Sequence, residues 1–305
     1  MASSFALKAA VIGLGSMGLG MAQSMVKGGI QTHGYDINSG SLASLTENGG
    51  YAAGSGKDAA RQSDILLVVV VNAAQTRAAL FGENGAASAM KPGGVIISCA
   101  TMSPDDARKL ALDAEALGLL YLDAPMSGGA AKAAIGQLTF MASGTAQAFE
   151  RAKPVLDLVA GKVYNLGDAA GIGASFKMVN QLLAGVHIAA ACEAVTFAKK
   201  LGLDLDRVYE VITASAGNSW MFENRVPHIL EGDYSPRSAI SIFTKDLGIV
   251  SDMGRKEKFP LYVAATALQM FLMTAAAGMD NDDDASVARM IAQITGLLLP
   301  PPKAS

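Results

Sequence analysis

Two polar side chains stand three residues apart in an otherwise apolar part of the sequence. Lys177 and Asn180 lie in the stretch Gly171–Asn180, GIGASFKMVN, whose periodicity predicts the start of a long helix. Residues three apart share one face of a helix, so both side chains should point the same way. A lone helical lysine is usually solvated, but apolar residues flank this one. Burial would favour its neutral amine, which can accept a proton, so Lys177 is the candidate general base.

A second candidate is the glycine-rich loop Asp123–Gly129, DAPMSGG, which follows a predicted strand. Ser127 supplies a hydroxyl, and Gly128 and Gly129 leave backbone N–H groups uncovered. That combination suits a carboxylate. Taken alone, however, these residues favour the alternative of an ordinary glycine-rich turn.

The sequence GLGSMG at residues 13–18 fits the pattern G-x-G-x-x-G, with Gly13, Gly15 and Gly18 as its glycines and Leu14 and Met17 between them. The pattern alone is weak because the chain has 33 glycines. Here it follows a predicted strand and opens a predicted helix, as in dinucleotide-binding folds. The helix N-terminus would offer free N–H groups to a pyrophosphate.

Asp36, at the end of the next predicted strand, bears on the choice of cofactor. A carboxylate there can accept hydrogen bonds from ribose hydroxyls and would repel a 2′-phosphate. Ile37 and Asn38 follow it, with no arginine to hold such a phosphate. The sequence therefore favours NAD over NADP. Two further predicted strand ends, at Asn72 and Thr101, either contact the cofactor or form turns.

The secondary structure must bring these residues together. The first half of the chain alternates apolar runs with amphipathic helical runs. That alternation predicts a Rossmann doubly wound, mainly parallel sheet. Thr139–Ala142 and Lys162–Tyr164 are expected to extend the sheet at its edge. The strands are expected at Leu7–Ile12, Gln31–Tyr35, Ile65–Val71, Gly94–Ser98 and Leu119–Asp123.

From about Gly167 the pattern becomes helical, which predicts an all-α C-terminal domain. We therefore expect two domains, an α/β NAD-binding domain over 1–165 and a helical substrate and oligomerisation domain over 166–305. The acidic run Asp282–Asp284 is predicted to be the solvated start of a helix. Trp220 is predicted to lie in the core. The later helices are expected at 172–201, 204–214, 222–230, 243–256, 260–277 and after residue 284.

Composition excludes several classes of function. The net charge of −3 does not favour nucleic acid or an anionic membrane as partner. Cys99 and Cys192 read as buried free thiols, and no Cys/His cluster has metal-ligand spacing, so no metal is expected. The N-terminus lacks a signal-peptide pattern. Polar residues interrupt the long apolar stretch 174–198, so we expect a cytoplasmic protein without a membrane span.

The chain resembles the β-hydroxyacid dehydrogenase family, which includes 3-hydroxyisobutyrate dehydrogenases. The resemblance covers essentially the whole chain and rests on four motifs in order: residues 13–18, residues 123–129, Gly173-x-x-x-Lys177-x-x-Asn180, and Lys245-Asp246-Leu247.

The resemblance implies Lys177 as catalytic residue and Ser127, Gly128, Gly129 and Asn180 as substrate contacts. It implies cofactor contacts at the glycine loop, Asp36, Asn72, Thr101 and Lys245. One departure is Gln181, where the family usually has a second asparagine.

Within the family, the stretch Ala216–His228 and residues 283–287 favour a branch that oxidises a four-carbon sugar acid. Asn218, Ser219, Glu223, Asn224 and His228 could supply the polar contacts that such a substrate needs. The alternative is a helix-capping turn at Asn218 or Ser219. A smaller hydroxy acid, such as 3-hydroxyisobutyrate or glycerate, is the near alternative. A reductase for imines and a non-catalytic NAD-binding module are the others. The apolar helices also suggest a homodimer or homotetramer.

Overall fold

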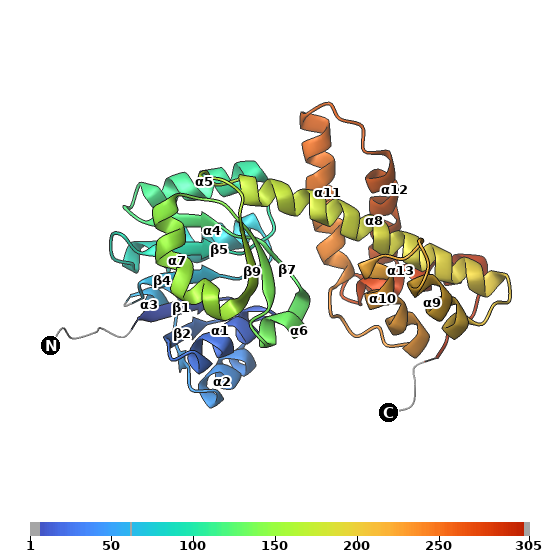
Figure 1. Ribbon diagram of the computed structural model, residues 1–305, viewed down its shortest axis with the longest axis horizontal. Helices are drawn as coiled ribbons and strands as arrows, with labels where there is room; N and C mark the ends of the chain where they lie inside the picture. The colour runs from blue at the N-terminus through green and yellow to red at the C-terminus, as the bar shows by residue number, and fades with distance from the viewer. Residues whose placement is uncertain (1–6, 62, 302–305) are drawn as a thin grey trace. The chain divides into compact units, whose positions relative to one another are not determined.

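A computed structural model describes residues 7–61 and 63–301 and divides into two compact units, 1–177 and 178–305. The first unit contains a six-stranded parallel sheet in the order β3-β2-β1-β4-β5-β6 (Figure 1). Strand order reverses between β1 and β4, as in a Rossmann fold. The predicted fold is confirmed. The strands are β1 (Lys8–Ile12), β2 (Gln31–Tyr35), β3 (Tyr51–Ala52), β4 (Ile65–Val68), β5 (Val95–Ser98) and β6 (Leu120–Asp123).

Both faces of this sheet are covered. Alternate residues of β1 belong to two separate apolar clusters, Ala9 and Val11 to one, Ala10 and Ile12 to the other. Successive strand residues point to opposite faces, so each cluster is the core on one side. The continuous apolar runs in β4 and β5 follow from burial on both sides.

Five helices of the first unit begin at residues suited to helix capping. Asn38, Ser55, Asn72, Ser103 and Thr145 each accept a backbone N–H from the first turn of the helix that follows. The helices are α1 (Gly18–Lys27), α2 (Ser39–Glu47), α3 (Gly56–Ala60), α4 (Ala73–Phe81), the turn η1 (Ala87–Ala89), α5 (Pro104–Glu115), α6 (Gly129–Ala134) and α7 (Ala146–Val159).

The strands at 139–142 and 162–164 do not extend the main sheet, contrary to the prediction. They form a separate three-stranded sheet of β7 (Met126–Ser127), β8 (Leu138–Ala142) and β9 (Ala160–Asn165). β7 pairs antiparallel with β8, because the segment 128–137, which contains α6, reverses the chain between them. The small sheet therefore includes part of the candidate substrate loop.

The second unit is helical, as predicted. Helix α8 (Ile172–Lys200) begins in the first unit and continues into the second. Helices α8 and α12–η2 are long and apolar enough to cross a membrane by length and composition, and just over half of the α8 window is buried within the chain. The other helices are α9 (Leu205–Thr213), α10 (Trp220–Glu231), α11 (Ile240–Lys256), α12 (Tyr262–Thr274), the turns η2 (Ala275–Met279) and η3 (Asp284–Ser286), and α13 (Val287–Thr295).

Candidate active site

The glycine loop lies at the switch point of the sheet, between the ends of β1 and β4. Gly13 has a φ of +92°, and a Cβ there would overlap the carbonyl oxygen of Val69. A Cβ on Gly18 would overlap the carbonyl of Gly13, whereas Gly15 faces open space. Two glycines thus permit the close packing of strand, turn and helix α1. The third leaves room for a ligand beside the helix N-terminus.

Asp36 holds this loop from the end of β2. Its Oδ2 accepts a hydrogen bond from the N–H of Leu14 at 2.6 Å, and its Oδ1 accepts one from Asn38 at 2.8 Å. Each carboxylate oxygen can accept more than one bond, so the group can still receive ribose hydroxyls. Leu14 is buried and Met17 is half-buried, so both side chains pack beneath the loop.

Two other predicted cofactor contacts follow strand ends. The Oδ1 of Asn72, beyond β4, accepts a hydrogen bond from the N–H of Gln75 at 2.8 Å and so caps α4. Thr101 is half-buried beyond β5. Asn72 thus forms a turn and caps a helix, and its contact with the cofactor stays a prediction.

Lys177 is buried, with 7% of its surface exposed, and its Nζ donates a hydrogen bond to the carbonyl oxygen of Met126 at 2.8 Å. Met126 immediately precedes Ser127. The candidate base is therefore held next to the candidate substrate loop within one unit. The sequence alone could not show this contact, because it joins residues 51 positions apart.

The substrate loop uses glycines for their conformational freedom. Gly128 and Gly129 have φ values of +135° and +72°. Gly128 precedes α6, and a Cβ on Gly129 would meet no neighbour within 4 Å. A Cβ on Gly128 would meet the side chain of Lys132 at 2.9 Å, so the open space suited to an anion lies at Gly129.

A buried carboxylate, Asp123, fastens helix α8 to the end of β6. Its Oδ2 accepts hydrogen bonds from the backbone N–H groups of Gly171 at 2.8 Å and Ala174 at 2.9 Å. The Oγ of Ser143 accepts one from Gly173 at 2.9 Å. A Cβ on Gly173 would overlap the carbonyl of Met141, so only glycine permits this approach. We call Asp123, Ser143, Gly171, Gly173 and Ala174 the Asp123 anchor.

Burial raises the pKa of Asp123 to about 6, although the N–H groups of Ala174 and Gly171, the Ser143 hydroxyl and Arg108 act in the opposite direction. Its carboxyl is therefore ionised at neutral pH. It then acts as an anion at the positive end of a helix dipole.

In the second unit, a chain of polar contacts joins the remaining motif residues. The Nδ2 of Asn180 donates to the Oε1 of Gln181 at 3.0 Å. The Nε2 of Gln181 donates to Asp246, which is buried and also pairs with Lys245. The departure from the family's second asparagine thus has a structural role, since the longer amide joins Asn180 to Asp246.

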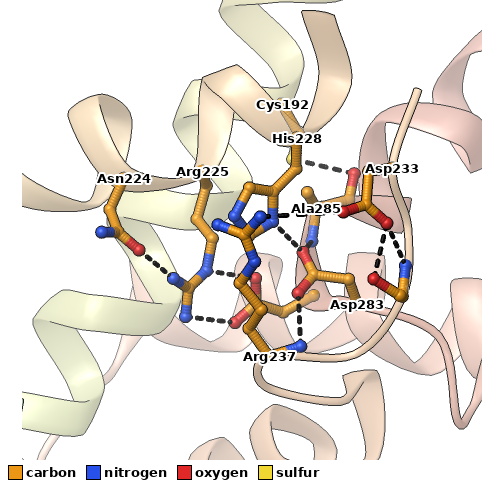
Figure 2. A network of polar contacts seen from close by, with 10 residues as sticks. Cys192, Asn224, Arg225, His228, Asp233, Arg237, Asp283 and Ala285 are labelled. Atoms are coloured by element: carbon orange, nitrogen blue, oxygen red, sulfur yellow. Dashed lines mark hydrogen bonds and ion pairs between the residues drawn. The ribbon is translucent and has the colours of Figure 1, made fainter. Parts of the chain in front are cut away.

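A larger polar network was not anticipated from the sequence. Arg225 of α10 forms a bidentate ion pair with Asp284. The Nδ1 of His228 lies 2.8 Å from the Oδ1 of Asp283 (Figure 2). We call Arg225, His228, Asp283 and Asp284 the C-terminal charge network. The two aspartates are fully buried, so the predicted solvated helix start is wrong. Asp283 does accept the N–H of Ala285 as a cap, but tertiary partners bury it.

The two aspartates of this network titrate differently. Burial raises the pKa of Asp284 to about 6, partly offset by Arg225. Burial also acts to raise the pKa of Asp283, but the hydrogen bond and charge of His228 outweigh it and hold that pKa below its usual value. The spacing of Arg225 and His228 on one helix, beside paired aspartates downstream, was the signal available in the sequence.

In the stretch 216–228, the predicted alternative of a helix cap at Ser219 is confirmed, whereas the prediction for Trp220 is wrong. Trp220 is 54% exposed and is not a core residue, because it starts α10 at the surface. Ser219 caps α10, and Asn218 bonds Glu223. The proposed substrate contacts of these polar residues stay predictions.

A parallel sheet that reverses order at a glycine turn, with a carboxylate after β2, defines a dinucleotide-binding Rossmann fold. Residues 8–167 match the NAD binding domain of 6-phosphogluconate dehydrogenase, and residues 171–291 match the NAD-binding domain of NADP-dependent 3-hydroxyisobutyrate dehydrogenase. The chain belongs to the β-hydroxyacid dehydrogenase family.

Similar proteins cover nearly the whole chain. An L-threonate dehydrogenase of Cupriavidus necator is 52% identical over 92% of this chain and 94% of its own. One from Haemophilus influenzae is 50% identical over 94% and 95%. The crystal structure of a 3-hydroxyisobutyrate dehydrogenase from Salmonella typhimurium has a TM-score of 0.90 at 49% identity, covering 93% of this chain and 99% of that one. The predicted family and enzyme class are confirmed.

Proposed function

We propose that this protein oxidises L-threonate to its 2-oxo acid with NAD. The observation that carries the substrate is the half-identity over more than nine-tenths of the chain to L-threonate dehydrogenases. The geometry supports the chemistry, because a buried lysine contacts the segment that carries Ser127.

The residues of the first unit fit a nicotinamide dinucleotide. The open space at Gly15 and the start of α1 suit a pyrophosphate, and the Asp36 carboxylate suits the adenosine ribose. Because that carboxylate would repel a 2′-phosphate, NAD is the proposed cofactor. We also propose Asn72, Thr101 and Lys245 as cofactor contacts, as the family resemblance implies.

In the proposed mechanism, the substrate carboxylate binds the N–H groups and hydroxyl of residues 127–129. Lys177 accepts the proton of the hydroxyl group, and its resulting charge stabilises the oxygen. Asn180, one turn further along α8, donates a hydrogen bond to the same substrate. The bound nicotinamide supplies the acceptor for the hydride from the carbinol carbon.

3-Hydroxyisobutyrate is the second candidate substrate, since the Salmonella structure is named for that activity. Glycerate is a further, smaller hydroxy acid of the same class. An imine reductase and a non-catalytic NAD-binding module are less well supported, because the lysine that we propose as the base for hydroxyl oxidation is buried at position 177.

The test is NADH formation by purified protein with L-threonate, D-threonate, D-erythronate, 3-hydroxyisobutyrate and D-glycerate, each with NAD and with NADP. We expect turnover of L-threonate with NAD. Turnover of 3-hydroxyisobutyrate or glycerate instead would retain the enzyme class and refute the substrate. Binding of NADH without turnover of any acid would refute the hydroxyacid dehydrogenase proposal.

We further propose that two copies of this chain associate through an apolar groove of about 740 Å³ formed by residues of α8, α9 and the start of α10. Phe197 and Val211 line it and are more than half exposed. Asp204 and Arg207 also line it, so a two-fold axis can place opposite charges across the interface. A dimer, or a tetramer built from two dimers, would bury this surface.

The oligomer is tested by sedimentation velocity on Phe197→Glu. We expect the variant to shift toward monomer, whereas Leu112→Glu, an exposed apolar position on α5, should not. An unchanged assembly in Phe197→Glu would refute this surface as the interface.

We propose a domain boundary near residue 165, where β9 ends. We also propose a cytoplasmic location, which agrees with the two buried free thiols.

A further inference from the structure

We propose that Asp123 is the positioning residue for Lys177: it fixes the start of α8 so that the amine meets the Met126 carbonyl. This inference rests on the proposed role of Lys177 as base. It concerns a residue outside the predicted catalytic set, and every contact that carries it lies within residues 123–177.

The first step is the attachment of the helix. Asp123 and Ser143 together accept three N–H groups at the start of α8, those of Gly171, Gly173 and Ala174. These groups have no partner within the helix itself. Asp123 and Ser143 also pair through their backbones, at 3.0 and 2.8 Å, so the two acceptors form one rigid support.

The second step is the distance from anchor to base. Lys177 lies four residues beyond Gly173, which is about one turn of helix. Met126, its hydrogen-bond partner, lies three residues beyond Asp123. The anchor and the lysine contact therefore tie the same helix to the same loop at two points, which fixes both the position and the rotation of that first turn.

The third step is the fit of the backbone. Gly171 has a φ of +94°, and a Cβ on Gly173 would overlap backbone carbonyls of the strands beneath. Side chains at these positions would hold the helix away from Asp123. Glycine is therefore needed at positions 171 and 173, because it lets the start of α8 approach the Asp123 carboxylate.

The experiment measures the exposure of the Lys177 amine independently of catalysis. Parent and Asp123→Ala proteins are labelled with limiting acetic anhydride, and acetylation of Lys177 is quantified by peptide mass spectrometry against exposed Lys132 in the same protein. Asp123→Asn keeps an acceptor oxygen without its charge and serves if the alanine variant fails to fold. Asp113→Ala, which removes a carboxylate from an exposed ion pair, is the matched control.

We expect Asp123→Ala to raise Lys177 acetylation several-fold and to lower kcat about 10–100-fold, since small misplacement of a reacting group has effects of that size. The NADH dissociation constant should stay within about twofold, since the hydrogen bonds of the anchor join residues 123, 143, 171, 173 and 174 and not the loop 13–18. Asp123→Asn should act in the same direction with a smaller effect.

Unchanged Lys177 acetylation in both variants would overturn the positioning role, whatever happens to kcat. Increased acetylation with unchanged kcat would confirm the positioning role and refute Lys177 as the base. The two proposals therefore fail separately.

Discussion

The Asp123 anchor and the C-terminal charge network both bury a carboxylate whose pKa is raised to about 6, yet they compensate it differently. Asp123 receives backbone N–H groups from the start of a helix. Asp284 receives a guanidinium from Arg225. Hydrogen bonds from backbone N–H groups fix the position of the helix backbone. An ion pair instead joins two elements through their side chains.

We expect the Asp123 anchor to serve catalysis and the C-terminal charge network to serve the stability of the fold. The anchor leads, one helical turn on, to a lysine that donates to a neutral carbonyl and remains available for chemistry in our proposal. The network joins α10 to the turn before α13 through paired side chains that are buried. Variants in the first region should therefore alter turnover, and variants in the second should alter the free energy of unfolding.

The largest expected effect is on turnover in Lys177→Met. Loss of the base should lower kcat by about 10²–10⁴-fold, because a positioned acid–base group contributes that much. Stopped-flow or steady-state NADH formation measures the loss, and fluorescence titration should show NADH binding within about twofold of the parent. Lys57→Met, at an exposed position on α3, is the control. Substantial residual activity in Lys177→Met would refute Lys177 as the base and, with it, the proposed catalytic role of this region.

The next largest effect is on stability in Arg225→Met. Removing one partner of a buried ion pair should lower the free energy of unfolding by about 3–5 kcal/mol. The loss should be smaller at pH 5 than at pH 8. Because the pKa of Asp284 is raised to about 6, its carboxyl becomes neutral at the lower pH and no longer needs the cation.

Urea denaturation at both pH values measures this stability difference. The double variant Arg225→Met/Asp284→Leu removes both charges and should recover most of the loss. A penalty in Arg225→Met that does not depend on pH would show that packing of the arginine, and not its charge, stabilises this region.

A third variant, Asp36→Ala, applies the same reasoning to the cofactor. Asp36, like Asp123, accepts backbone N–H groups. Losing its bonds to ribose should shift kcat/KM toward NADP by about 10–100-fold relative to NAD, given about 1.5–3 kcal/mol for a hydrogen bond to a charged group. Kinetics with both cofactors test this, with Asp113→Ala as the control. An unchanged preference would contradict the proposed role of Asp36.

The smallest effect is expected at an exposed ion pair. Lys153 and Asp157 are paired at 2.7 Å on α7, but both side chains are more than half exposed. Lys153→Ala should change the free energy of unfolding by no more than about 0.5 kcal/mol. Thermal denaturation in low and high salt provides the check. A loss comparable to that of Arg225→Met would mean that burial is not what distinguishes the charge network.

The sequence alone determined most secondary-structure elements and the order in which the candidate site motifs follow one another along the chain. Apolar runs and 3.6-residue periodicity are local signals, so the parallel strands, the glycine turn, the long helix and the helical second half followed directly. The glycine loop, Asp36 and Lys177 were identified because residue type and spacing carry their signals. The cap at Asn72 was one of two alternatives that the sequence left open.

Contacts between distant residues depended on the folded structure. The separate sheet of β7, β8 and β9, the burial of Asp283 and Asp284, and the exposure of Trp220 reflect long-range packing that no local pattern encodes. The same holds for the hydrogen bonds that join Asp123 to Gly171 and Lys177 to Met126, across 48 and 51 residues. Burial is a property of what packs against a side chain, so it is decided only when the chain is folded.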